Sequence, residues 1–139
     1  MNVKEFKIQI ALGSIPEKMK LKLARSRNTS LEILTKLSKD QDEDIRCHIA
    51  HNPNTSPEIL IKLSKDQDET VRTYIAGNPN TPLKILIKLS KDPDEAVRYW
   101  VVENTNTPLE ILTKLSKDPD YDVEHFAKRK IKVQVCGRS

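Results

Sequence analysis

Three side chains able to bind a metal ion stand close together at Cys47, His48 and His51. In a helix Cys47 and His51 would share one face, because residues four apart lie one above the other. A structural zinc ion needs four ligands, however, and no further cysteine or histidine follows at a recognised spacing. The third histidine, His125, is not paired with a cysteine or carboxylate either. We therefore predict no metal, no cofactor and no catalytic residues, and hence no enzyme.

The acidic segment from Asp40 to Asp44 resembles the first half of a calcium-binding loop. Such a loop requires glycine at its sixth position and glutamate at its twelfth, and this chain has Ile45 and His51 there. Helix capping explains the acids better, with Asp42 as the cap and Glu43 in the first helical turn. Asp68, Asp94 and Asp120 stand at equivalent positions.

Lysine and arginine recur at intervals of 26 residues, in successive copies of a repeated segment. We call each set of equivalent residues a column. Two lysine columns could follow a phosphate backbone, although glutamates four residues earlier and the helix dipole also explain them. An arginine column lies beside acidic linkers, which favours ion pairs between successive copies of the repeat. The columns are Lys36, Lys62, Lys88 and Lys114; Lys39, Lys65, Lys91 and Lys117; and Arg46, Arg72 and Arg98, with Glu124 in the fourth copy.

An aromatic or imidazole side chain occupies one further column in every copy, while its type changes from histidine to tyrosine, tryptophan and phenylalanine. On a helical wheel this column borders the apolar stripe, so packing at the edge of the core is one interpretation. A binding surface is the other, because neighbouring outward positions vary freely. The predicted partner-binding residues are Cys47, His48, His51, Thr73, Tyr74, Tyr99, Trp100 and Glu103.

These columns arise from four similar segments that begin at Leu31, Pro57, Leu83 and Leu109, 26 residues apart and without insertions. A short strict period predicts supersecondary units that must stack on one another to bury their apolar faces. The first half of each unit predicts one helix, from about Ser30 to Lys39 in the first copy, and the second half predicts another that stops before Asn52-Pro53. The third copy lacks that proline, so its second helix is expected to end less sharply.

Helix starts are predicted from polar residues. Thr29, Thr55 and Thr107 precede a glutamate by three residues, the spacing of a capping box. Ser14 and Glu17 show the same spacing, which predicts a half-repeat before the first full copy. The core is predicted to contain the residues at 33, 34, 37, 45 and 49 and their equivalents in the later copies.

The chain is predicted to be a single domain, 1–139. It comprises an N-terminal capping segment and half-repeat over 1–27, four tandem repeats over 28–127, and a basic C-terminal tail over 128–139. Apolar residues at Phe6, Ile8, Ile10 and Leu12 alternate as in a strand, but we favour a divergent capping helix there. The tail could form either a helix extension or a short strand.

Charge is uneven along the chain. The net charge is +4, yet residues 28–127 carry 12 basic and 18 acidic residues, so both ends are basic and the repeats acidic. The two separate cysteines favour a reduced, cytoplasmic protein. Neither a signal peptide nor the ~20 apolar residues of a membrane span is present, so we expect no membrane association.

The pattern N-P-N-T-P-x-x-I-L-x-K-L-S-K-D-x-D-x-x-V-R-x-x-I-A, over roughly residues 14 to 127, resembles the leucine-rich repeat variant family, a relative of HEAT-like α-solenoids. The resemblance implies an all-α fold, a right-handed solenoid (superhelix) of about four and a half 26-residue two-helix repeats. A founding member also has a cysteine-rich iron–sulfur segment, which this chain lacks. Fold resemblance says little about function.

Two functions follow from these patterns. The first is a non-enzymatic scaffold, monomeric, that binds a protein or peptide through the variable surface of each second helix. The alternative is nucleic-acid binding through the basic termini and the lysine columns. The acidic repeats argue against the alternative, because they would repel phosphates.

Overall fold

The computed structural model describes residues 1–11 and 13–137, and every regular element in these residues is an α-helix. This confirms the predicted all-α fold. The ten helices of the described chain are α1 (Val3–Ala11), α2 (Glu17–Arg25), α3 (Leu31–Leu37), α4 (Glu43–His51), α5 (Pro57–Leu63), α6 (Glu69–Gly77), α7 (Leu83–Leu89), α8 (Glu95–Glu103), α9 (Leu109–Leu115) and α10 (Tyr121–Cys136).

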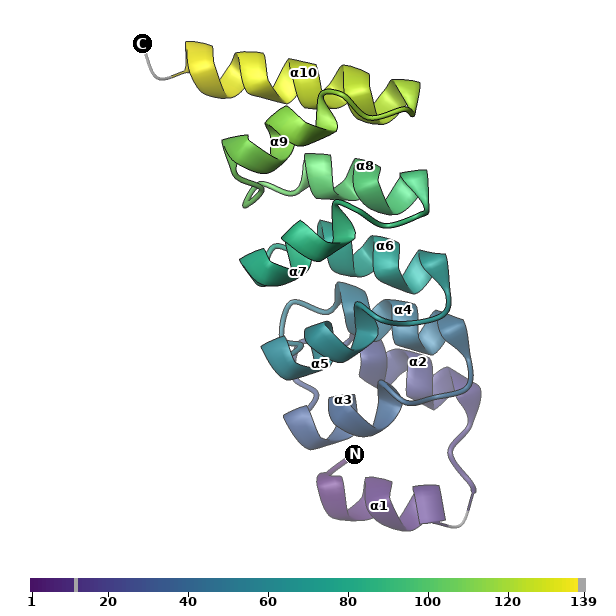
Figure 1. The fold of residues 1–139 in the computed structure, drawn as a ribbon. Helices are drawn as coiled ribbons and strands as arrows, with labels where there is room; N and C mark the ends of the chain where they lie inside the picture. The colour runs from purple at the N-terminus through teal and green to yellow at the C-terminus, as the bar shows by residue number, and fades with distance from the viewer. Residues whose placement is uncertain (12, 138–139) are drawn as a thin grey trace.

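The helices are arranged in two layers along one long axis, with α1 and α10 at opposite ends (Figure 1). One layer contains α2, α4, α6, α8 and α10, each packed on the next. The short helices α3, α5, α7 and α9 form the other layer. Because helix bounds recur at 26-residue steps, equivalent residues of successive copies lie in rows along the stack.

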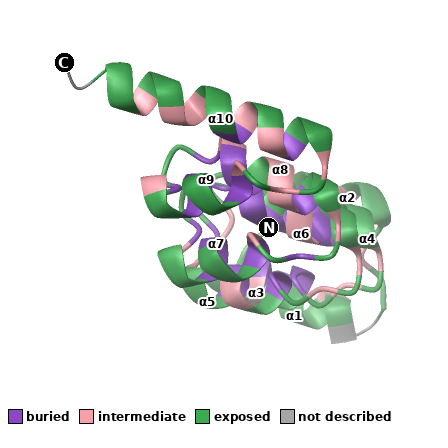
Figure 2. Cartoon of the chain, turned by 45° about the horizontal axis from the view of Figure 1, so that its top comes forward, coloured by how far each residue is buried: buried purple, intermediate pink, exposed green. Residues whose placement is uncertain are grey.

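The core lies between the two layers, as the apolar pattern predicted. Each short helix buries one isoleucine and two leucines, and each of α4, α6 and α8 buries at least two β-branched residues. Figure 2 shows these buried positions on the sides of the helices that face the opposite layer. The buried positions of the first two copies are Ile33, Leu34, Leu37, Ile45, Ile49, Ile59, Leu60, Leu63, Val71 and Ile75.

Aspartates begin the longer helices, as predicted. The side chains of Asp42, Asp68, Asp94 and Asp120 each accept a hydrogen bond from the backbone N–H two residues later, at 2.8 to 3.0 Å. These bonds satisfy N–H groups that have no partner within the helix.

The predicted threonine capping boxes are wrong. Ser30 and Ser56 cap α3 and α5 instead, and α7 and α9 begin after prolines without a side-chain cap. The preceding threonines turn back towards the previous helix, because a buried hydroxyl needs a nearby acceptor. Each donates to a backbone carbonyl six residues earlier, at 2.5 to 2.6 Å: Thr29, Thr55, Thr81 and Thr107. Ser14 likewise donates to the carbonyl of Gln9 and caps no helix.

Asparagines hold successive helices of the longer layer together. The buried side chains of Asn52, Asn78 and Asn104 each donate to a backbone carbonyl 28 residues earlier, at 2.7 to 2.8 Å. Asn104 makes this bond without a following proline, and α8 ends at the same position as α4 and α6. The expectation of a less sharp end to the third helix is therefore wrong, because the asparagine fixes the end.

Arginines join the same copies at the opposite end of these helices, which confirms the predicted ion pairs. Arg46, Arg72 and Arg98 each donate two hydrogen bonds to an aspartate of the next copy, with the shorter one at 2.8 Å. Lys20 occupies the equivalent place in α2 and pairs with Asp40 at 2.9 Å. One such ion pair therefore joins α2 to the first copy and each copy to the next.

Both ends of the described chain are helical. Residues 3–11 form α1, which confirms the capping helix and excludes the strand for these residues; its Phe6 is 1% exposed. Leu12 lies outside the described residues. Tail residues 128–136 extend α10 rather than forming a strand, and residues 138–139 lie outside the described part. Within the residues described, no helix has the length and apolar character needed to cross a membrane.

Candidate binding surfaces

The structure gathers part of the predicted partner-binding set into one pocket on the outer side of α4, α6 and α8. The pocket has a volume of about 260 Å³ and is lined mainly by carbon atoms of six residues: His51, Thr70, Thr73, Tyr74, Gly77 and Trp100. Four of these were predicted from the sequence. We call it the aromatic pocket.

Two half-exposed aromatic rings form the walls of the aromatic pocket. Tyr74 is 42% and Trp100 44% exposed. The ring of Tyr74 meets His51 edge-on, with ring centroids 5.6 Å apart. Trp100 lies across Gly77, where a Cβ atom would be only 3.2 Å from the indole Cε3 atom. The absence of a side chain at Gly77 therefore allows the indole ring to approach the backbone of α6.

Gly77 and Thr70 complete the pocket and were not among the predicted site residues. The signal at Gly77 was present in the sequence, because the same column contains His51, Glu103 and Arg129 in the other copies. A glycine in a helix costs about 1 kcal/mol relative to alanine, and close packing against Trp100 gives a reason for it. Thr70 gave no such signal.

The aromatic column divides into exposed and half-buried members. Tyr74 and Trp100 are exposed, whereas His48 and Phe126 are half-buried. Tyr99 is also half-buried and contacts both Trp100 and Phe126 edge-on, at centroid distances of 5.8 and 5.3 Å. Burial, together with nearby Glu103, raises the pKa of the Tyr99 phenol. Tyr99 therefore supports Trp100 from behind rather than lining the pocket.

Cys47 was expected on the outer surface and is instead 7% exposed within the core. Burial raises the pKa of its thiol to about 11, which makes the thiol unreactive at neutral pH. The helical wheel placed Cys47 outwards, but the neighbouring helix of the same layer covers that flank of α4. Cys47 is therefore excluded from the binding surface.

His48 contacts another copy rather than solvent alone. Its Nε2 atom accepts a hydrogen bond from the Arg25 Nε of α2 at 3.3 Å. Burial and the charge of Arg25 lower the pKa of the His48 imidazole. A neutral His48 is thus part of the α2–α4 interface, at the edge of the stack.

Glu103 lies one turn beyond Trp100 and belongs to a second hollow of about 340 Å³, with Phe126, Arg129, Lys130 and Val133. Its carboxylate is 4.0 Å from the Lys130 ammonium group. This hollow is more charged than the aromatic pocket and extends the outer surface towards α10.

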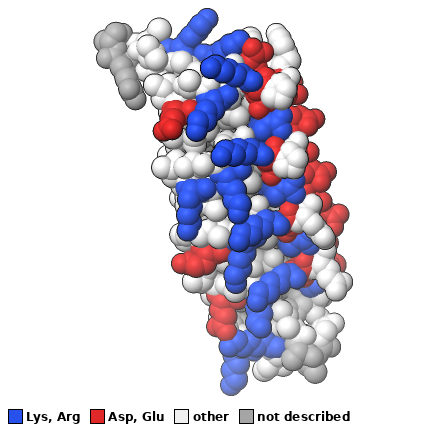
Figure 3. All heavy atoms as spheres, viewed as in Figure 1, with Lys and Arg blue, Asp and Glu red and all other residues white. Residues whose placement is uncertain are grey.

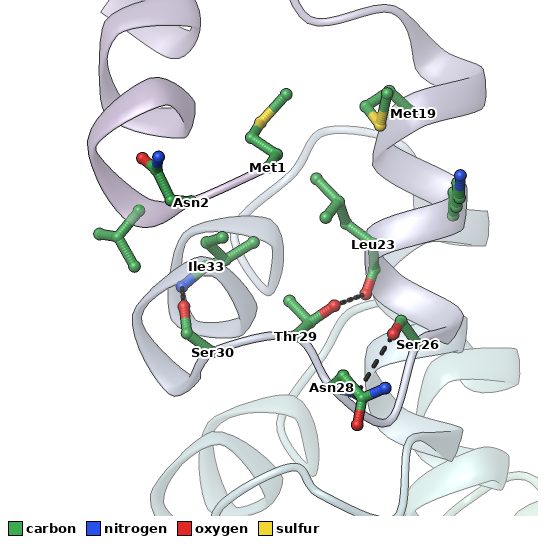
Figure 4. A pocket seen from close by; sticks show the side chains of 11 residues that line it. Met1, Asn2, Met19, Leu23, Ser26, Asn28, Thr29, Ser30 and Ile33 are labelled. Carbon is green, nitrogen blue, oxygen red and sulfur yellow. Dashed lines mark hydrogen bonds between the residues drawn. The ribbon is translucent and has the colours of Figure 1, made fainter.

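Another hollow, of about 470 Å³, lies between α1, α2 and α3 (Figure 4). Met1, Leu23 and Ile33 line it, and its polar groups bond locally, as in the hydrogen bond from Thr29 to the Leu23 carbonyl. Lys22 is its single titratable side chain, so it contains no acid–base pair. Over the described residues, no group of three or more His, Cys, Asp and Glu side chains is placed to hold a metal ion.

The two lysine columns lie on the short helices and just beyond them, and all eight side chains are exposed. Figure 3 shows Lys and Arg side chains running along this face for most of the stack, with the acids gathered mainly at one edge. Among the residues that the structure describes, one of the eight forms an ion pair, Lys114 with Glu110 at 4.0 Å. Glu32 pairs with Lys7 of α1 and not with Lys36. Pairing with glutamates therefore does not account for these columns.

Searches against known protein families, curated proteins and solved structures found no match to this chain.

Proposed function

We propose that this chain is a non-enzymatic scaffold that binds a segment of a protein or peptide in the aromatic pocket. The proposal includes a right-handed α-solenoid of about four and a half repeats, of the leucine-rich repeat variant and HEAT-like kind, acting as a cytoplasmic monomer. The regular recurrence of helix bounds and the contacts between successive helices support the solenoid. The two separate cysteines support a reducing compartment.

The observation that carries the proposal is the pairing of half-exposed Tyr74 and Trp100 around an open pocket. Tyrosine and tryptophan are the residues most often responsible for binding energy in protein interfaces. The volume of about 260 Å³ is below the range of roughly 300 to 1,000 Å³ of small-molecule sites. One apolar side chain of a partner is the ligand that suits it best.

The charges on the three helices that form the aromatic pocket indicate what should flank that side chain. Arg46, Arg72 and Arg98 are engaged by aspartates, and the remaining formal charges of the three helices are all negative. These are Glu43, Asp44, Glu69, Glu95 and Glu103, of which Glu103 lies 4.0 Å from Lys130 of α10. Complementary charge favours encounter with a basic partner. We therefore expect a partner segment with an apolar residue next to lysine or arginine.

The pocket is also held in shape before binding. The Arg72–Asp92 pair and the hydrogen bond from Asn78 to the Ala50 carbonyl join the copies that provide its walls. A preformed site loses less conformational entropy when a ligand binds, so more of the contact energy contributes to affinity.

Selection from a random peptide library tests the proposal. Enriched peptides should contain an apolar residue flanked by basic residues. Their binding should change the fluorescence of Trp100, the one tryptophan in the chain. Gly77→Leu, which fills the pocket, and Trp100→Ala should each weaken binding at least tenfold, the loss expected for a central aromatic contact.

The matched control is Tyr121→Ala, which removes a more exposed aromatic ring, 72% exposed, on α10 and outside the pocket. It should leave the affinity unchanged. Enrichment of peptides whose binding resists both Gly77→Leu and Trp100→Ala, in variants with native circular dichroism, would exclude the aromatic pocket as the site. Enrichment of acidic peptides would contradict the expected partner chemistry.

A further inference from the structure

We propose that the opposite face of the stack is a second, independent site that binds the phosphate backbone of a nucleic acid without reading its sequence. This lysine face consists of the two columns on the short helices and just beyond their ends: Lys36, Lys39, Lys62, Lys65, Lys88, Lys91, Lys114 and Lys117. It shares no residue with the aromatic pocket.

The spacing of the lysine face suits a linear polyanion. Within each copy the two lysines are three residues apart, about one helical turn. Between copies they recur with the stack, whose long helices pack on one another, and packed helices lie about 8 to 10 Å apart. Four copies therefore extend the row of charges over roughly 25 to 30 Å, the length of about eight base pairs at 3.4 Å each.

Most acids of the repeats are engaged elsewhere. Asp66, Asp92 and Asp118 are engaged by the arginines of the preceding copy, and Asp42, Asp68 and Asp94 cap helices of the other layer. The short helices themselves contain three acids, Glu32, Glu58 and Glu110, and the third copy has Lys84 in place of the glutamate. At the first copy Glu17, Asp40 and Asp42 do line a hollow together with Lys36 and Lys39. Over all four copies, however, the short helices and the lysines just beyond them carry nine lysines and three glutamates, so this face has an excess of positive charge although residues 28–127 as a whole are acidic.

The type of cation favours phosphate over a protein carboxylate. The chain uses arginine wherever it binds a carboxylate with two hydrogen bonds, as in Arg72 with Asp92, and places lysine on the open face. Lysine acts as a flexible point charge that suits phosphates and is depleted in protein interfaces. None of the four short helices contains an aromatic residue on which a base could stack, so the contact is with the backbone alone.

The test compares oligonucleotide binding by fluorescence anisotropy between 20 and 200 mM NaCl, with duplex and single-stranded 20-mers of unrelated sequence. The wild-type chain should bind every sequence equally, with an affinity that falls steeply with salt. Replacing Lys36, Lys62, Lys88 and Lys114 with glutamine should reduce the slope of log K against log[salt] by about 3 to 4 for duplex, since each phosphate contact contributes about 0.9.

The matched control replaces Lys18, Lys22, Lys128 and Lys132, exposed lysines of α2 and α10, with glutamine. It removes the same charge and should change the slope by less than one. Circular dichroism verifies that both variants fold.

Three outcomes overturn the proposal. The first is the absence of salt-sensitive binding, and the second is an equal reduction of the salt slope in the control variant. The third is displacement of the protein from DNA by polyglutamate at equal charge concentration, which would indicate an acidic protein as the ligand. Trp100→Ala should leave oligonucleotide binding intact, so this test and the peptide test fail independently.

Discussion

Asp92→Ala should be among the most destabilising polar substitutions in the chain. The Asp92 carboxylate is 6% exposed and accepts two hydrogen bonds from Arg72, at 2.8 and 3.2 Å. It also accepts one from the Asp94 backbone N–H at 2.9 Å. Removing it leaves a largely buried guanidinium group with its two backbone acceptors and no counter-charge.

The expected cost is worked from these contacts. Loss of one partner from a buried ion pair costs about 3 to 5 kcal/mol. Arg72 retains some exposure, so we expect the lower end, about 3 kcal/mol. Asp92→Asn, which can retain the bond from Asp94, should cost about 1 kcal/mol less, the worth of one hydrogen bond.

The assay is urea unfolding followed by circular dichroism at 222 nm. With an m value of about 2 kcal/mol/M, Asp92→Ala should lower the midpoint by about 1.5 M. Glu69→Ala, an exposed acid of α6, is the matched control and should shift ΔG by less than about 0.5 kcal/mol. A double-mutant cycle with Arg72→Ala should return a coupling energy above about 1 kcal/mol. A loss within 0.5 kcal/mol of the control, or no coupling, would refute the assigned role of this pair.

Three further predictions follow from single side chains. At pH 8 a thiol reagent should modify exposed Cys136 rapidly and Cys47, with its pKa raised to about 11, only on unfolding; two fast thiols would contradict the burial of Cys47. Burial and the charge of Arg25 lower the pKa of the His48 imidazole in the folded state. The contribution of His48 to stability is therefore complete at a pH above 6.5, the ordinary pKa of histidine, and is lost as the pH falls through the folded-state pKa. Urea midpoints at pH 7.5 and 5.5 should therefore differ less in His48→Gln than in the wild type, and an unchanged difference argues against this role. Asn78→Ala should lower the free energy of unfolding by about 1 to 3 kcal/mol, because it leaves a buried backbone carbonyl of α4 without its donor. An unchanged urea midpoint would show that the hydrogen bond from Asn78 to the Ala50 carbonyl does not stabilise the stack.

Local features were predicted where one copy contains all the residues involved. The apolar positions at Ile33, Leu34 and Leu37 and the cap at Asp42 depend on helical periodicity and on the backbone of a single helix. Thr55 was misassigned because a capping box and a bond back to the previous helix use the same residue types. The acceptor, the Ile49 carbonyl, is brought close only when the turn between the helices closes.

The aromatic pocket could be predicted only in part, because its walls come from three copies. His51, Tyr74 and Trp100 belong to α4, α6 and α8, and their proximity depends on how closely these helices pack. The same packing buries Cys47. A helical wheel describes one helix and its apolar face, whereas α4, α6 and α8 are each also covered on both flanks by helices of the same layer.

The sequence by itself determined the repeating unit, its two helices and the composition of every column along the stack, because these depend on periodicity and on interactions within a few residues. Only the tertiary structure decided which charges face solvent and which are engaged. Asp66 and Asp92 count as acids in the sequence, but packing against the preceding copy places them beside arginines, while Lys62 and Lys88 remain exposed. The physical reason is that a formal charge is a property of a residue, but the potential of a surface depends on the neighbours that folding provides.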